Sequence, residues 1–323
     1  MGEGGTDMKI VFFGTPEYVL PVLESIHKVF GVNLSKSPIT AVVTQKPKPV
    51  GRKQMLMYSP VDNWAHKHKV PIYFDPRDII SEKIEADLGV LASYGNIIPK
   101  EVIKYFPYGI LVIHPSLLPQ FRFSSPVPAA IITDTNPTGI SIIKMDEKLD
   151  HGQIVTQSKE EILPDDTYAS LRDRLFAKSS KVLVSMLPAY IKGKINLKPQ
   201  DDSKATFARM IGKEDAYIPP EYLNACLQGK TLKREWKIPF IKNYSLVPSA
   251  YSFERFVRAM QPWPGAWTTI RIKNQELRIK ILKAHLDTKD KTPYLVLDSV
   301  QLEGKNPVTW KQFEEGYPTA TLE

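Results

Sequence analysis

A histidine and an aspartate each follow a stretch of chain that is typical of a buried strand. His114 comes directly after the apolar residues 110–113, and Asp150 follows the mostly apolar run 140–145 and a short turn. In an open α/β sheet, side chains at the ends of such strands converge on one crevice. An imidazole and a carboxylate in that crevice could together handle the proton of an attacking amine. The pair indicates acid–base chemistry, against the alternative of a purely structural histidine.

Both residues belong to longer motifs. His114 opens the run His-Pro-Ser-Leu-Leu-Pro, with Arg122 three residues beyond it, and Asp150 is followed by His151 and Gly152. These motifs resemble those of the folate-dependent formyltransferases, and the resemblance extends over almost the whole chain. It implies a formyl transfer with 10-formyltetrahydrofolate as co-substrate. In that reaction His114 would manage protons, and Asp150 would orient the imidazole and help to accept the proton.

The same resemblance implies which residues contact the folate. The segment 116–119 would line the slot with backbone groups and apolar side chains, although a proline-bounded loop is the alternative interpretation. Asp146 would lie in the loop on the pterin side, unless its carboxylate only caps a turn. The expected folate-binding residues are Tyr94, Ser116, Leu117, Leu118, Pro119 and Asp146.

Two positions depart from the family pattern. Val112 stands where the family has the catalytic asparagine, and side chains two residues apart on a strand share a face, so Val112 should lie beside His114. Valine cannot donate the hydrogen bond that would stabilise a developing oxyanion. Asn96 or an ordered water could replace the missing amide. Phe123 stands where the family has a glycine, which tolerates backbone angles that phenylalanine does not.

Within the superfamily, the chain is most similar to the members that formylate methionyl initiator tRNA. The loop 45–53 is basic and rich in proline, and it resembles the insertion loop with which those members contact the tRNA acceptor end. Lys48, Arg52 and Lys53 are therefore expected to bind tRNA. The alternative for such a charged run is a solvated loop.

Two other functions stay open. A sugar or small-amine N-formyltransferase would share the first part of the chain, but the segment Pro-Trp-Pro-Gly-Ala-Trp (262–267) and the basic end of the chain argue against it. A catalytically weak folate- or tRNA-binding protein is compatible with Val112 and Phe123.

Composition supports a globular protein with a polyanionic partner. The net charge is +8, and residues 204–323 carry 19 basic against 13 acidic residues, which favours nucleic acid. A charged surface that only confers solubility is the alternative. No apolar run reaches the ~20 residues of a membrane span, and the one cysteine, Cys226, excludes an internal disulfide framework. We expect a cytoplasmic monomer without a metal site, because His66 and His68 would face apart on a helix.

The order of elements predicts two domains. Strands at 8–13, 40–43 and 88–92 alternate with helices, which indicates a Rossmann-like, mostly parallel sheet in a formyltransferase domain over residues 1–203. A long helix is predicted at 167–192. Short alternating strands at 269–272, 277–284 and 294–300 predict an OB-like antiparallel β-barrel domain over residues 204–323. Residues 218–250 within it are expected to form a surface excursion.

The strands of the second domain alternate cationic and apolar residues. Arg271 and Lys273 are expected on one strand face, and Arg278 and Lys280 on another, with Ile279 and Ile281 on the opposite side. This pattern predicts an apolar core beneath a surface that contacts RNA phosphates. Four aromatic residues are expected to pack the domain: Trp263, Trp267, Trp310 and Phe313.

Overall fold

The computed structural model describes residues 8–31, 37–50 and 54–322. The chain forms two units that interleave along the sequence, each with its own sheet. The first comprises Met1–Pro119, Gly139–Glu160 and Arg172–Ala205, and the second comprises Gln120–Thr138, Glu161–Leu171 and Thr206–Glu323. A single boundary between residues 203 and 204 remains a prediction.

The first unit is built on a seven-stranded sheet in the order β5-β2-β1-β6-β7-β8-β9. Its strands are β1 (Ile10–Gly14), β2 (Ile39–Val43), β5 (Ile72–Tyr73), β6 (Leu88–Ala92), β7 (Ile110–His114), β8 (Thr138–Lys144) and β9 (Gln153–Glu160). The pairs from β5 to β7 are parallel, whereas β7 and β8 are antiparallel. Every residue of β1 and β7 is buried, as expected for strands covered on both faces. The predicted mostly parallel sheet is confirmed.

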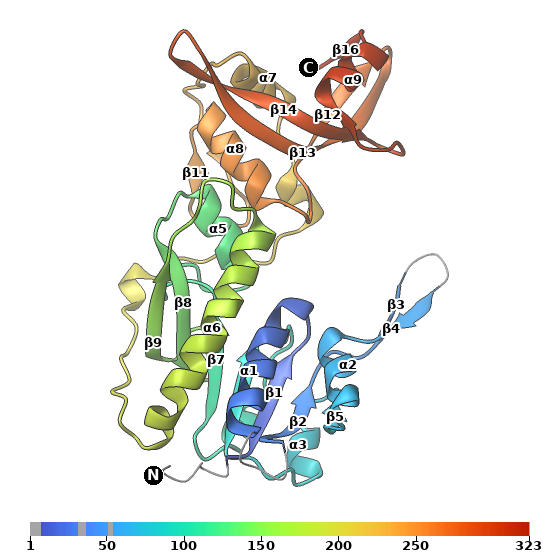
Figure 1. Cartoon of the computed structure of the whole chain (residues 1–323). Helices are drawn as coiled ribbons and strands as arrows, with labels where there is room; N and C mark the ends of the chain where they lie inside the picture. The colour runs from blue at the N-terminus through green and yellow to red at the C-terminus, as the bar shows by residue number, and fades with distance from the viewer. Residues whose placement is uncertain (1–7, 32–36, 51–53, 323) are drawn as a thin grey trace. The chain divides into compact units, whose positions relative to one another are not determined.

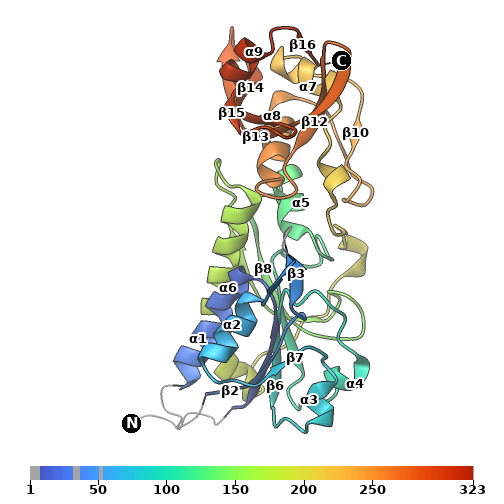
Figure 2. The same cartoon turned by 90° about the vertical axis from the view of Figure 1, so that its right-hand side faces the viewer.

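Helices cover both faces of this sheet. Figure 1 shows the whole chain, and Figure 2 shows α1 and α2 on one face of this sheet and α3 and α4 on the other. Proline at position 21 occupies the first turn of α1, where its missing N–H costs nothing. Ser59 caps α2 by accepting the backbone N–H of Asp62. The helices of this unit are α1 (Leu20–Gly31), α2 (Pro60–Lys67), α3 (Asp78–Ser81), α4 (Lys100–Ile103) and most of α6 (Tyr168–Ile191).

A short hairpin interrupts the first unit between β2 and α2. It consists of β3 (Lys48–Val50) and β4 (Met55–Met57), and Figure 1 shows it extending away from the seven-stranded sheet. All three residues of β4 are exposed. Of the predicted tRNA-binding residues, Lys48 lies on β3, while Arg52 and Lys53 lie outside the described residues.

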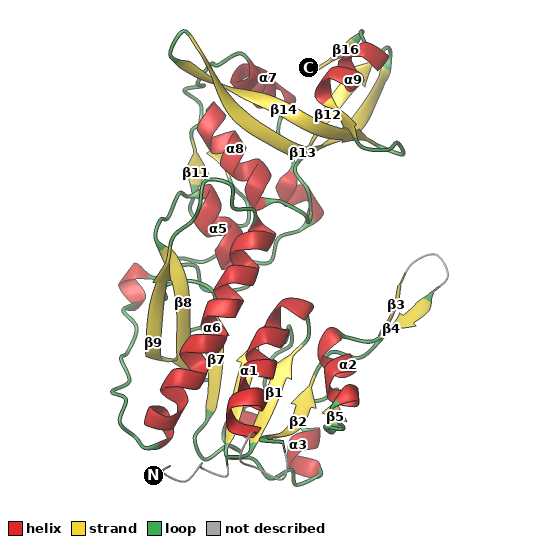
Figure 3. Cartoon of the chain, in the orientation of Figure 1, coloured by secondary structure: helices red, strands yellow, loops and turns green. Residues whose placement is uncertain are grey.

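The second unit holds an antiparallel sheet in the order β15-β14-β13-β12-β16, shown in Figure 3. Its strands are β12 (Trp267–Ile272), β13 (Gln275–Lys289), β14 (Thr292–Leu302), β15 (Val308–Thr309) and β16 (Ala320–Thr321). The helices are α5 (Pro126–Ile132), α7 (Pro220–Leu227), α8 (Ala250–Ala259) and α9 (Trp310–Gly316). Phe253 and Phe256 of α8 are fully buried and pack against Trp236. The curled sheet confirms the predicted OB-like antiparallel domain.

The segment 218–250 is not the surface excursion that we expected. It contains α7 and a small hairpin of β10 (Trp236–Lys237) and β11 (Ser245–Leu246). Its buried apolar side chains include Ile218, Tyr222, Leu223, Cys226, Ile238, Phe240, Ile241 and Leu246. The expectation was wrong because the proline and lysine residues hid this sparse apolar pattern. Burial raises the pKa of the Cys226 thiol to about 12, so the cysteine is a packed apolar residue.

Three cations share one face of the second sheet. Arg271 lies opposite Glu276, and Arg278 and Lys280 lie opposite Thr269 and Trp267 in the β12–β13 pair. Residues two apart on a strand share a face, so Arg271, Arg278 and Lys280 point to the same side. The buried apolar layer with Ile279 and Ile281 is confirmed, whereas Arg271 lies on the same face as Arg278 and Lys280 and not on another. Lys273 is a correction, because it has a φ of +56° and lies beyond the end of β12.

The aromatic residues of this unit have divergent environments. Trp267 is buried, and the guanidinium of Arg278 stacks 3.7 Å from the centre of its ring. Phe313 is buried and stacks on Trp310. Trp263 is 53% exposed, so the expectation that it packs the domain was wrong. It stands between Pro262 and Pro264.

Candidate active site

The structure brings His114 and Asp150 together in the first unit. His114 is the last residue of β7, and Asp150 lies in the turn after β8, which pairs with β7. The imidazole Nδ1 is 3.5 Å from the Asp150 Oδ1 atom, and the two side chains are 6% and 17% exposed. At this distance a small movement forms a hydrogen bond, which would fix the orientation of the ring.

The backbone around Asp150 is held in an unusual conformation. Asp150 has a φ of +51°, a region that costs a residue with a side chain about 1–2 kcal/mol. The side-chain amide of Gln200 donates hydrogen bonds to the carbonyl oxygens of Asp150 and Gly152, at 2.8 and 2.9 Å. One amide thus holds both sides of the turn that presents the carboxylate to His114.

Replacing Gln200 should therefore impair the site without touching the reacting groups. We expect Gln200→Ala to lower the rate of the chemical step by about 10-fold, because displacing a catalytic group by even 1 Å is costly. The check is a single-turnover rate, compared with that of Gln228→Ala, which removes an exposed glutamine of the second unit. An unchanged rate would show that the turn keeps its shape without this amide.

His151 links the turn to two more carboxylates. Its Nδ1 atom lies 2.6 Å from Asp146 Oδ2, and its Nε2 atom lies 3.3 Å from Asp202 Oδ2. Asp146 also accepts the backbone N–H of Lys148 through its other oxygen, at 2.9 Å. The carboxylate of Asp146 therefore caps this loop, which is the alternative that the sequence left open. A role in folate binding remains a prediction.

Gly152 is required by a close approach of two backbone segments. A Cβ atom at this position would lie 1.9 Å from the carbonyl oxygen of Lys144, at the end of β8. We expect Gly152→Ala to lower the free energy of unfolding by about 1–3 kcal/mol, since a backbone neighbour cannot move aside cheaply. Chemical denaturation would measure it. Gly316→Ala, which meets no atom within 4 Å, should have little effect.

The segment Ser116–Pro119 is fixed by a buried hydrogen-bond network. Ser141 of β8 accepts the backbone N–H of Leu118 at 3.0 Å and donates to the carbonyl of Ser116 at 2.7 Å. Gln157 of β9 donates to the Leu118 carbonyl at 2.9 Å and to the Ser141 hydroxyl at 2.8 Å. This segment follows His114 directly, so the network sets its distance from the imidazole.

Val112 lies in an apolar cluster next to this segment. It is 6% exposed and is buried together with Leu118 and Ile143. Met145 and Ile154 pack against the same cluster. The environment of Val112 is therefore dry, and no side chain of this cluster donates a hydrogen bond toward the position of the family's asparagine.

Tyr94 and Asn96 follow the end of β6, as expected from the sequence. The Tyr94 side chain is 1% exposed and packs edge-on against Phe13 in the core. Burial raises the pKa of its phenol, while a hydrogen bond with Asn96 opposes the rise. The strand end turns the Tyr94 ring inward, and its contact with folate remains a prediction. The amide of Asn96 interacts with this phenol, and its role as the replacement donor also remains a prediction.

Phe123 belongs to the second unit and shows the backbone that the sequence implied. Its φ is +80°, the left-handed region that favours glycine. The ring lies 5.1 Å from that of Phe207, and the backbone N–H of the neighbouring Arg122 donates to the Thr206 carbonyl. The local geometry expected of a glycine is thus retained with phenylalanine.

The remaining expectations concern Lys48, a metal site and a membrane-spanning helix. The ammonium of Lys48 donates to the Gln45 side chain at 3.0 Å. Over residues 8–31, 37–50 and 54–322, no group of three or more His, Cys, Asp or Glu side chains is arranged to hold a metal ion. No helix among these residues has both the length and the apolar composition needed to cross a membrane.

Sequence reasoning missed three side chains that shape the site. Ser141 could have been found, because it is a polar residue inside the apolar run 140–143. Gln157 and Gln200 carried no such signal. Gln200 lies in a polar stretch of the sequence, and only the fold brings its side chain into a hydrogen bond with the Asp150 carbonyl.

The chain matches two protein families. Residues 8–187 match the formyl transferase family, and residues 248–293 match the formyl transferase C-terminal domain family. Over 296 residues the chain is 33% identical to a methionyl-tRNA formyltransferase of Chloroflexus aggregans, covering 90% of this chain and 85% of that protein. It is 34% identical to a methionyl-tRNA formyltransferase of Buchnera aphidicola, covering 86% of this chain and 79% of that protein.

Solved structures share the fold at lower identity. A methionyl-tRNA formyltransferase from Clostridium thermocellum aligns with a TM-score of 0.52 at 17% identity, over 91% of this chain and 98% of that one. An N-formyltransferase from Helicobacter canadensis, in complex with folinic acid and dTDP-3-aminofucose, aligns with a TM-score of 0.61 at 15% identity, over 87% and 89%. With both family matches and relatives above 30% identity over most of their length, the chain belongs to the methionyl-tRNA formyltransferases of the formyl transferase family.

Proposed function

We propose that the protein transfers the formyl group of 10-formyltetrahydrofolate to the α-amino group of methionyl initiator tRNA. The observation that carries the proposal is the approach of His114 Nδ1 to Asp150 Oδ1, at 3.5 Å, in a chain whose relatives are methionyl-tRNA formyltransferases. The pair supplies the acid–base function that an amine nucleophile needs.

The residues present account for each proton of the transfer. The neutral amine attacks the formyl carbon, and a new carbon–nitrogen bond forms as the carbonyl becomes an oxyanion. His114 takes the proton that the attacking nitrogen releases, and Asp150 stabilises the imidazolium that results. The bond between the formyl carbon and the folate nitrogen then breaks, and the imidazolium returns its proton to that nitrogen.

Stabilisation of the oxyanion is the most difficult requirement for this site. Val112 shares a strand face with His114 and offers no donor. Stabilisation of the oxyanion would then come from Asn96, from His114, from backbone N–H groups or from a bound water. The transfer is expected to be slower than in relatives that have an amide here, since one such donor contributes about 3 kcal/mol in other acyl transfers.

Two acceptor classes can be separated by experiment. Sugar N-formyltransferases are among the structural neighbours, so an amino-sugar nucleotide is the competing acceptor. Single-turnover reactions with 10-formyltetrahydrofolate should formylate methionyl-tRNA, and the amino-sugar nucleotide should remain unmodified. Formylation of the sugar amine alone would refute the proposal, as would formylation of neither acceptor.

Binding of tRNA should depend strongly on salt. The basic loop with Arg52 and the cationic face of Arg271, Arg278 and Lys280 would each contact phosphates. We expect Arg52→Ala and Lys280→Ala each to make the slope of log affinity against log salt shallower by about one unit. Titrations at several salt concentrations measure this slope. An affinity that does not change with salt would point to a small-molecule acceptor.

A further inference from the structure

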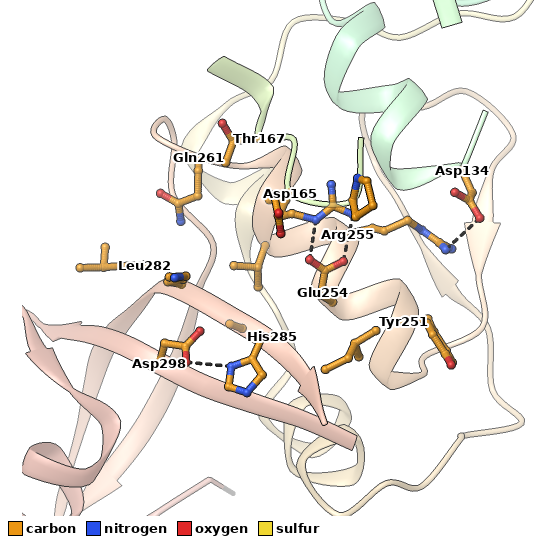
Figure 4. A pocket seen from close by; sticks show the side chains of 16 residues that line it. Asp134, Asp165, Thr167, Tyr251, Glu254, Arg255, Gln261, Leu282, His285 and Asp298 are labelled. Atoms are coloured by element: carbon orange, nitrogen blue, oxygen red, sulfur yellow. Dashed lines mark hydrogen bonds and ion pairs between the residues drawn. The ribbon is translucent and has the colours of Figure 1, made fainter. Parts of the chain in front are cut away.

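A cavity of about 900 Å³ lies within the second unit, between α8, the segment 164–167 and the strands β13 and β14. Figure 4 shows the side chains that line it. Five consecutive residues of β13, 282–286, are part of the lining. Since side chains alternate between the two faces of a strand, a wall of consecutive residues means that the cavity follows the edge of β13.

That edge of β13 has no neighbouring strand. β12 pairs with β13 only over Gln275–Lys280, whereas β14 pairs with it as far as Lys289. In the sheet order β15-β14-β13-β12-β16, no strand of the described chain lies beside the other edge of β13 from residue 283 onward. Backbone N–H and C=O groups at such an edge can pair with an added strand.

The ladder between β13 and β14 is irregular at the cavity. Its register runs from the pair Ile281–Val300 to Lys283–Ser299 and then to Ala284–Leu297. Leu282 on β13 and Asp298 on β14 are therefore left without cross-strand partners, and both line the cavity. Bulges of this kind redirect side chains and are frequent beside functional sites.

Two buried polar atoms in the cavity lining lack a hydrogen-bond partner among the described residues, namely Arg255 Nε and Asp298 Oδ2. The other ends of both groups are engaged. Arg255 Nη1 donates to Asp134 at 3.1 Å, and Asp298 Oδ1 lies 2.8 Å from His285 Nδ1 (Figure 4). Unpaired buried atoms are rare, and a ligand with one acceptor and one donor would satisfy both.

The charge of the lining does not suit a phosphate backbone. Arg258 is already bound to Glu254 and to the carbonyl of Asp166. Carboxylates outnumber fixed cations in the lining, with Asp134, Asp165, Glu254 and Asp298 against Arg255, Arg258 and Lys283. A nucleic acid strand would bring further negative charge to this surface, whereas a neutral or basic segment of polypeptide would not.

We propose that this cavity binds an extended peptide segment of a partner protein, which adds as a strand to the free edge of β13. The peptide backbone would pair with residues 283–289, as in other strand-addition complexes. A basic side chain of the peptide would donate to Asp298 Oδ2, and a carbonyl or carboxylate would accept from Arg255 Nε. This site is separate from His114 and Asp150 and does not depend on the proposed formyl transfer.

The test uses the full chain and two fluorescent, end-capped peptides, Val-Lys-Val-Glu-Val and Val-Glu-Val-Lys-Val. Both place the two charges on one face of a strand, in opposite orders. We expect one order to bind, and N-methylation of alternate residues in that peptide to weaken binding by at least about 10-fold, because it removes main-chain donors. Asp298→Asn should weaken binding of the same peptide, whereas Glu303→Gln, an exposed acid outside the cavity, should not.

Three results would overturn the proposal. The first is that neither peptide binds, in which case Lys283 and the bulges serve only to protect the edge from unwanted pairing. The second is that N-methylated peptides bind as well as the parent peptide, which rules out strand addition. Because this test changes the peptide and not the protein, misfolding of a variant cannot explain the result. The third is that a short single-stranded oligouridylate displaces the bound peptide from the cavity, which would identify the cavity as an RNA-binding surface.

Discussion

His114→Ala and Asp150→Asn should each lower the single-turnover rate of formyl transfer by at least about 100-fold, the usual range for loss of a positioned acid–base group. The reason is their placement. Both side chains are largely buried, and Nδ1 and Oδ1 are 3.5 Å apart, so water cannot easily replace either group. Asp150→Asn keeps the shape of the side chain and removes only its charge.

The affinity for tRNA should be nearly unchanged in both variants, because neither residue is expected to contact phosphate. This split between rate and affinity distinguishes loss of chemistry from loss of folding or binding. His66→Ala is a control, since it removes an exposed histidine of α2 that is not part of the site. Near-normal turnover in either active-site variant would refute the assignment of the pair.

The sequence predicted the parts of the site that depend on short-range pattern. Apolar runs located β7 and β8, and the alternation of a strand placed Val112 on the same face as His114. The motif around Asp150 located the turn that carries the carboxylate. These inferences succeeded because strand periodicity and the order of strands act over a few residues and are visible along the chain.

The parts that could not be predicted depend on contacts between distant segments. Gln200 reaches the turn at Asp150 from 50 residues away, and Ser141 fixes Leu118 across two strands. Tyr94 turns into the core although it follows a strand end, because Phe13 and its neighbours offer an apolar site for the ring. Such contacts leave no signal in the local sequence, because the burial of a side chain depends on the packing around it.

Val112→Asn should raise the rate of the chemical step by about 10-fold, because the new amide would lie on the face of β7 that carries His114 and could donate to the oxyanion. The gain should fall short of a donor's full value, since the neighbouring groups are shaped around valine. The variant should also lose about 1–3 kcal/mol of stability, because its amide enters the dry cluster with Leu118 and Ile143.

Two further variants make this prediction decisive. Val112→Thr keeps the shape of valine and adds one hydroxyl donor, so it should raise the rate less but remain folded. Ile113→Asn places the same amide on the opposite face of β7, where Ile113 is equally buried, and it should lose stability without any gain in rate. Single-turnover rates and denaturation curves of all three would be compared. If neither Val112 variant is faster than the parent protein, the oxyanion is already stabilised by His114 or backbone N–H groups, and the loss of the family's asparagine carries no catalytic cost in this chain.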